Sequence, residues 1–155
     1  MKVISVPMHC FASNCYLVIS EKGNCAVIDP GMEPENIIKS IEENHLTPKM
    51  ILLTHGHYDH FCAVPGLKER YPEIQLMAAE KELPLLSDPK KNYSATAVGM
   101  PLTLTPDRLL KDGDKIELDE LEFTVWETPG HTAGCLTYFC GDAIFTGDTL
   151  FVQSC

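Results

Sequence analysis

Residues 51–60, ILLTHGHYDH, place three histidines and an aspartate within six positions, directly after an apolar run. Imidazole and carboxylate groups are ligands that zinc, iron and manganese accept. His55 and His57 lie two residues apart and can point to the same side of an extended or tightly turned segment. Asp59 and His60 are adjacent and point elsewhere, so this hexapeptide could serve two neighbouring metal positions. Surface histidines in a loop are the alternative interpretation, which four potential ligands in six residues make the weaker one.

Two later segments repeat the design of an apolar strand, a tight turn and a coordinating residue. VWETPGHTAGC places His131 after Pro129 and Gly130, and AIFTGDTLF places Asp148 after Gly147. A glycine beside each candidate lets the backbone approach a crowded centre. An aspartate at a strand end is also a common turn or cap residue. Asp148 is therefore a candidate ligand because of the histidines that accompany it.

A fourth segment, AVIDPG, places Asp29 between a strand-like run and a turn. A carboxylate in that place could orient a ligand histidine from behind. Asp-Pro-Gly is also a turn-forming sequence, and the pattern supports both interpretations equally.

The charge balance argues against a nucleic-acid partner. The chain has 22 acidic against 12 basic residues and a net charge of −10, and its densest basic segment is only PKK at 89–91. No apolar stretch approaches the length of a membrane span, and the N-terminus lacks the apolar region of a secretory signal. We therefore expect no nucleic acid, no membrane association and a cytoplasmic location.

The seven cysteines include no CxxC pair, and most lie inside apolar runs. This pattern indicates reduced, buried thiols rather than a disulfide framework.

The length of 155 residues fits a single domain over residues 1–155. Periodicity predicts strands at 2–7, 14–20, 24–29, 49–54, 73–79, 115–118, 121–127, 135–140 and 143–146, and helices at 34–46, 61–71 and 80–86. A strand–helix–strand succession over 24–54 predicts an α/β fold with a buried central strand. Residues 87–108 read as a long surface loop, either a substrate-facing lid or an ordinary insertion.

Taken in order, VIDPG, THGHYDH, TPGH and FTGDTLF resemble the metallo-β-lactamase superfamily, and GHTAG with GDTLF is similar to its small glyoxalase II-like hydrolases. The resemblance implies an αβ/βα four-layer sandwich with a metal centre at one edge of its two sheets. It implies that His55, His57 and His131 bind a first metal. It also implies that Asp59 and His60 bind a second metal, and that Asp148 bridges the two.

The activity implied is hydrolysis of a small-molecule acyl thioester or ester. One or two Zn²⁺ ions, with iron or manganese as alternatives, would generate a hydroxide near neutral pH, and Asp59 would orient it. No cysteine receives a catalytic role. An iron-dependent sulfur dioxygenase, using His55, His57 and a carboxylate, and an inactive metal-binding remnant are the other hypotheses.

Members of the family continue beyond GDTLF with further helices and strands and a last histidine. Here no histidine follows His131. We therefore expect a C-terminally truncated chain in which the second half of the sandwich is incomplete and the second metal position lacks one ligand. The sequence does not indicate an oligomeric state.

Overall fold

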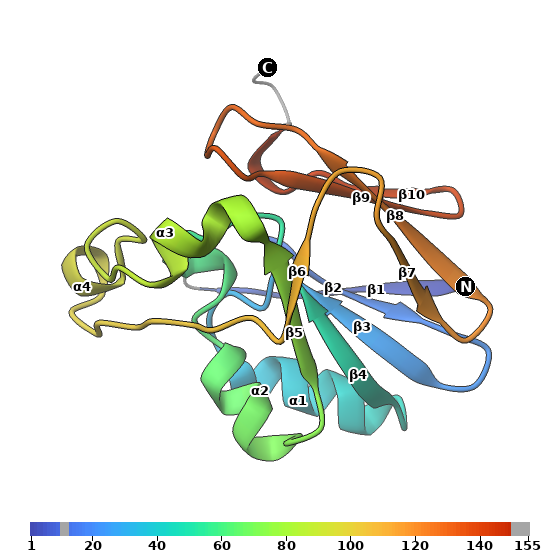
Figure 1. Ribbon diagram of the computed structural model, residues 1–155. Helices are drawn as coiled ribbons and strands as arrows, with labels where there is room; N and C mark the ends of the chain where they lie inside the picture. Colours follow the sequence, from blue (N-terminus) through green and yellow to red (C-terminus); the bar gives the residue numbers. More distant parts are fainter. Residues whose placement is uncertain (10–12, 150–155) are drawn as a thin grey trace.

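Two β-sheets pack face to face, and helices cover the outer side of one of them (Figure 1). The computed structural model describes residues 1–9 and 13–149. The larger sheet follows chain order: β1 (Lys2–Val6), β2 (Cys15–Ile19), β3 (Asn24–Ile28), β4 (Thr47–Leu52), β5 (Gln75–Ala79) and β6 (Arg108–Leu110). The smaller sheet has the order β10 (Ala143–Phe145), β9 (Leu136–Cys140), β8 (Leu121–Glu127) and β7 (Lys115–Leu118).

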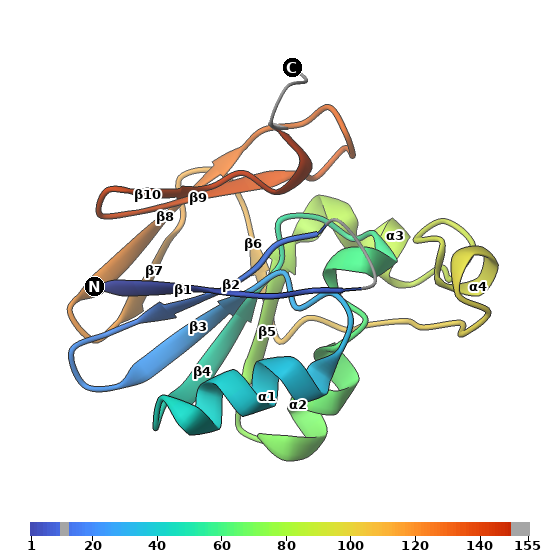
Figure 2. The same cartoon turned by 180° about the vertical axis from the view of Figure 1, so that it is seen from behind.

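The larger sheet is mixed. Its first three strands are antiparallel, whereas β3 to β6 are parallel. Helix α1 (Pro34–Glu43) connects β3 to β4, and α2 (Val64–Arg70) connects β4 to β5. Both lie on the face turned away from the smaller sheet, as the view from behind also shows (Figure 2). Parallel strands with crossover helices place their carboxyl ends at a common edge, where binding sites form.

The predicted helix at 34–46 forms, but it ends at Glu43. Pro34 lies in its first turn, where the missing N–H costs no hydrogen bond. Ile37 and Ile41 are fully buried against the sheet, in agreement with the predicted apolar face.

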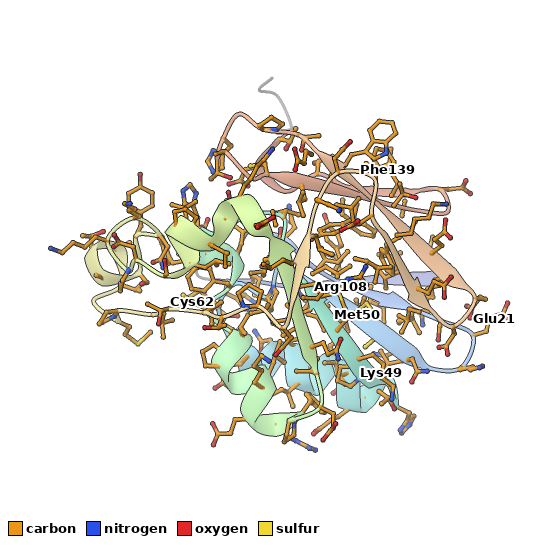
Figure 3. All side chains as sticks on the ribbon, in the orientation of Figure 1. Glu21, Lys49, Met50, Cys62, Arg108 and Phe139 are labelled. Carbon is orange, nitrogen blue, oxygen red and sulfur yellow. The ribbon has the colours of Figure 1, made fainter. Side chains whose placement is uncertain are left out.

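Strand β4 is apolar on both sides because both faces of the larger sheet are covered. Ile51 points into the core beneath α1 and α2, whereas Met50 and Leu52 point into the core between the two sheets. Figure 3 shows Met50 among the side chains that fill this second core. Period-two alternation between two buried faces explains the continuous apolar run in the sequence.

The outer face of the smaller sheet is exposed in the described part of the chain. Trp126 and Ile144 are more than half exposed, and Phe139, labelled in Figure 3, packs against Trp126 with ring centroids 4.5 Å apart and the ring planes tilted by 49°. The described residues thus form three layers, a helical layer and two sheets. Two packed sheets with helices on the outer face of the larger one confirm the predicted α/β sandwich class.

Several predicted boundaries shift by one to three residues. The strand predicted at 49–54 is β4 at 47–52, so Leu53 and Thr54 lie beyond its end. The helix predicted at 61–71 starts three residues later, with Pro65 in its first turn. The segment predicted as a helix at 80–86 divides into the 3-10 turn η2 (Glu80–Glu82) and α3 (Leu83–Leu86).

The sequence reading missed two elements in or next to the loop at 87–108. Helix α4 (Ser94–Ala97) lies inside it, and β6 begins at its last residue. Strand β6 has only three residues, and two are exposed. Its hydrogen bonds to β5 define it as a strand, which local composition does not reveal. None of the helices in the described ranges is long and apolar enough to cross a membrane.

Candidate metal centre

The two sheets are tied together at the end of β4, directly below the first histidine. The hydroxyl of Tyr138 donates a 2.6 Å hydrogen bond to the carbonyl of Leu53, and the N–H of Leu136 donates a 2.8 Å bond to that of Thr54. These bonds join β9 of one sheet to the end of β4 in the other. They bring the loop that carries His131 next to the loop that carries His55.

Three predicted ligands meet at this junction. One ring nitrogen from each of His55, His57 and His131 lies within 4.8 Å of the other two. Nδ1 of His57 and Nε2 of His131 are 3.1 Å apart. Nε2 of His55 is buried and has no hydrogen-bond partner. A buried imidazole nitrogen without a partner is costly, and three converging imidazoles are a donor set that suits zinc.

A second group shares His55 with the first. Ligand atoms of His55, His60 and Asp148 also lie within 4.8 Å of one another. Oδ1 of Asp148 is 3.2 Å from Nε2 of His60, and Oδ2 of Asp148 is 3.1 Å from Nε2 of His131. Asp148 therefore contacts histidines of both groups, which is the arrangement that a bridging ligand requires.

Asp59 lies at the side of this second group. Its Oδ2 is 3.7 Å from Nε2 of His60, and its side chain is partly exposed. It belongs to the 3-10 turn η1 (Tyr58–His60), which directly follows His57. Residues predicted from segments up to 93 positions apart thus converge at one edge of the two sheets.

Asp29 lies behind the centre, where it joins two buried groups. Its Oδ1 accepts the N–H of Thr54 at 2.7 Å, and its Oδ2 accepts the Thr54 hydroxyl at 2.6 Å and lies 2.9 Å from Nδ1 of His60. Of the two interpretations open from the sequence, these contacts favour the carboxylate that orients a histidine. With Nδ1 turned toward Asp29, Nε2 of His60 faces Asp148.

The buried histidines have opposite electrostatic environments. Burial, reinforced by the charge of His60, lowers the pKa of His55 to about 2, so its ring is neutral at pH 7. Burial also lowers the pKa of His57, and His131 adds to this effect. Burial alone would lower the pKa of His60, but Asp29 and Asp148 outweigh it and raise that pKa to about 10. Neutral rings such as those of His55 and His57 are the form that binds a metal.

Asp148 stays ionised beside these rings. Burial would raise its pKa, but hydrogen bonding to His60 and the charge of His60 lower it to about 2.

Glu82, which the sequence reading missed, is a buried carboxylate between the two histidine loops. Only 1% of its surface is exposed. Its Oε2 accepts the N–H of Gly56 at 2.6 Å, and its Oε1 accepts the N–H of Gly134 and the hydroxyl of Thr132. The sequence contains part of a signal: Glu82 follows the strand predicted at 73–79, and glycines lie within three residues of the histidines in both loops.

A cavity of about 390 Å³ opens beside His57 and His131. Its other walls come from η2, α3, the loop at 87–108 and the loop after His131: Lys81, Glu82, Pro84, Leu85, Lys91, Tyr93, Thr132 and Ala133. The ring of Tyr93 lies 5.2 Å from that of His57. Tyr93 has φ +69°, a left-handed conformation that is unusual for a bulky residue. The loop at 87–108 therefore forms a wall of the cavity.

The sequence matches the family model described as "Metallo-beta-lactamase superfamily" over residues 9–155. It is 33% identical over 156 aligned residues to a hydroxyacylglutathione hydrolase of Enterobacter sp. (strain 638), covering all of this chain and 53% of that protein. It is 35% identical to the hydroxyacylglutathione hydrolase GloC of Haemophilus influenzae, covering 97% of this chain and 73% of that one. The chain thus spans about half the length of the Enterobacter relative.

Solved structures share the fold. BLEG-1, a B3 metallo-beta-lactamase, superposes with a TM-score of 0.89 at 31% identity, covering 98% of this chain and 74% of that one. TTHA1623 in a di-iron-bound form has a TM-score of 0.81 at 33% identity, with coverages of 97% and 74%. ETHE1 from Myxococcus xanthus has a TM-score of 0.75 at 26% identity, with coverages of 99% and 60%.

Proposed function

The chain belongs to the metallo-beta-lactamase superfamily, and we propose that it is a zinc-dependent hydrolase of small acyl thioesters. The observation that carries the proposal is the convergence of His55, His57 and His131 around a buried ring nitrogen with no hydrogen-bond partner. The similarity to hydroxyacylglutathione hydrolases, at 33% and 35% identity, supports the choice of a thioester.

Under this proposal the three histidines would hold the first ion, and His60, Asp59 and Asp148 would hold a second, which would displace the proton that Asp29 and Asp148 favour on the ring of His60. A bound zinc ion polarises an acyl carbonyl and lowers the pKa of water to about 7. Asp29 keeps the ring of His60 oriented through the 2.9 Å contact with Nδ1. Asp59, partly exposed beside His60, would accept a hydrogen bond from a water molecule and orient it toward the substrate.

The cavity beside His57 and His131 would receive the acyl thioester. Pro84, Leu85 and Tyr93 provide apolar wall, which suits an acyl chain.

Cysteine chemistry is not part of this mechanism. Burial, together with the charge of Asp59, raises the pKa of Cys62 to about 11, so its thiol is protonated and a poor nucleophile at neutral pH. The described cysteines are all free, and four of the five are buried. This state agrees with the cytoplasmic location that we propose from the cysteine pattern.

Iron-dependent oxidation of sulfur compounds is the second candidate. The similarity to TTHA1623 in its di-iron form and to ETHE1 favours it, because the same histidines and Asp148 could hold iron. Oxygen consumption with an iron-loaded sample distinguishes it from hydrolysis, which needs no oxygen.

The test uses the purified full chain, freed of metal by a chelator and then reloaded with zinc. We expect hydrolysis of S-lactoylglutathione to stop on chelation and to return with zinc. His131→Ala should abolish the activity, whereas His9→Gln, at a ring that is 75% exposed and bonded to Glu33, should not. A zinc-loaded chain that leaves the thioester intact would contradict the proposal, and a β-lactam assayed in parallel would show whether the hydrolysis has another target.

A further inference from the structure

We infer that Glu82 is a positioning residue that sets the separation of the two histidine loops and thereby the affinity of the three-histidine group for its ion. This inference rests on the proposed metal site. Glu82 contributes no ligand atom to either histidine group found among the described residues. Its role follows from the backbone and side-chain groups that its carboxylate holds.

All three hydrogen bonds to the Glu82 carboxylate come from the two histidine loops: Gly56 and Thr132 adjoin ligand histidines, and Gly134 lies three residues after His131. Gly56, whose N–H lies 2.6 Å from Oε2, stands between His55 and His57 in the chain. Thr132 directly follows His131, and its hydroxyl lies 2.9 Å from Oε1. One buried carboxylate thus contacts both loops, although they lie about 75 residues apart in the sequence.

Two glycines show how closely the loops approach this carboxylate. A Cβ at Gly134 would lie 2.6 Å from Oε1 and 2.8 Å from Cγ of Glu82. A Cβ at Gly56 would lie 3.1 Å from Oε2. At both positions a larger residue would push the carboxylate or the loop away. The missing side chains at the glycines of the THGH and HTAG segments therefore leave room for the Glu82 carboxylate.

The donor pattern requires a carboxylate of this length. Each Glu82 oxygen accepts from a backbone N–H, so the amide nitrogen of a glutamine would face one of these donors. Glu82→Gln has nearly the same volume and would lose the tie to one loop. An aspartate would be one methylene too short to reach both loops from the same backbone position.

The experiment measures the zinc affinity of the metal-free full chain by competition with a chromophoric chelator. Residues that orient metal ligands typically change affinity by about 10- to 100-fold, and we expect Glu82→Gln to weaken zinc binding by at least about tenfold. The matched control is Glu80→Gln, an exposed glutamate of the same 3-10 turn, which should leave the affinity unchanged. The absorption spectrum of the Co²⁺-loaded variant should also change, because the ligand geometry changes.

A second variant covers the case in which Glu82→Gln does not fold. Thr132→Val keeps the carboxylate and removes one donor, so we expect a loss of zinc affinity of about fivefold. The thermal unfolding temperature of each metal-free variant is measured in parallel. Unchanged zinc affinity in the folded variants, with or without a lower unfolding temperature, would overturn the inference and leave Glu82 a purely structural residue. A wild-type chain that binds no zinc would overturn the proposed function as well.

Discussion

Asp29 and His60 form a buried pair, with Oδ2 of Asp29 lying 2.9 Å from Nδ1 of His60 and both side chains 3% exposed. The same carboxylate accepts two hydrogen bonds from Thr54, at the point where β4 turns into the histidine loop. One side chain thus links the end of β3, the end of β4 and a candidate ligand.

Asp29→Asn should lower the free energy of unfolding by about 2 kcal/mol, because a charged acceptor with three polar contacts becomes a neutral amide. Asparagine tolerates the φ of +48° at this position, so the backbone should keep its conformation. Urea denaturation measures the change. Asp142→Asn, at an exposed turn, serves as control and should be nearly neutral. Equal stability of the two variants would show that the buried network contributes little.

Gly147→Ala should destabilise the chain and displace Asp148. Gly147 has φ +53°, and an added Cβ would collide with Oγ1 and Cβ of Thr54. The matched control is Gly113→Ala, where φ is +81° but nothing lies within 4 Å of the new Cβ. In the control the free energy of unfolding should fall by only about 1 kcal/mol, the cost of a left-handed backbone conformation at alanine. Urea denaturation should therefore show a clearly larger loss at Gly147, and equal losses would refute the steric argument.

Tyr93→Asn should raise the KM for the thioester by about three- to tenfold, because the substrate loses an aromatic wall of the cavity. Asparagine can adopt the left-handed conformation of Tyr93, and the Tyr93 ring is already half exposed. The unfolding temperature should consequently change little. Steady-state kinetics measures KM and kcat separately. A fall in kcat at constant KM would mean that the ring acts on the chemical step instead.

Asp107→Asn should reduce stability at pH 7 and not at low pH. The pKa of Asp107 is lowered, first by the hydrogen bond from the N–H of Leu76 and then by Lys68. A carboxylate whose pKa is lower in the folded chain stabilises the fold above its unfolded pKa of 3.8, and this contribution disappears as pH falls through the folded pKa.

Because the Asp107 side chain is 43% exposed, we expect a difference of about 1 kcal/mol or less between wild type and variant at pH 7. Urea denaturation from pH 7 down to the acid limit of the fold measures it. A difference that persists unchanged at the lowest pH would show that the charge is not responsible.

Much of the centre could be predicted because each candidate lies at a strand end followed by a turn. The helical period after Pro34 and the apolar run before His55 predict a strand–helix–strand unit with parallel strands. The carboxyl ends of parallel strands lie at the same edge of a sheet. Strand β6 and Glu82 could not be predicted in this way. Strand β6 exists because β5 offers it an unpaired edge, and Glu82 sits in a short charged segment that resembles an exposed helix start.

The sequence by itself determined the local spacing of His55, His57, Asp59 and His60, because residues so close together are constrained by the geometry of a single turn. It also determined that β4 is covered on both faces, since a continuous apolar strand cannot face water. Only the tertiary structure decided that Nε2 of His131 meets Nδ1 of His57 at 3.1 Å. That contact depends on how the two sheets pack, which no local pattern encodes. The burial of Glu82 between the two histidine loops is likewise a result of that packing.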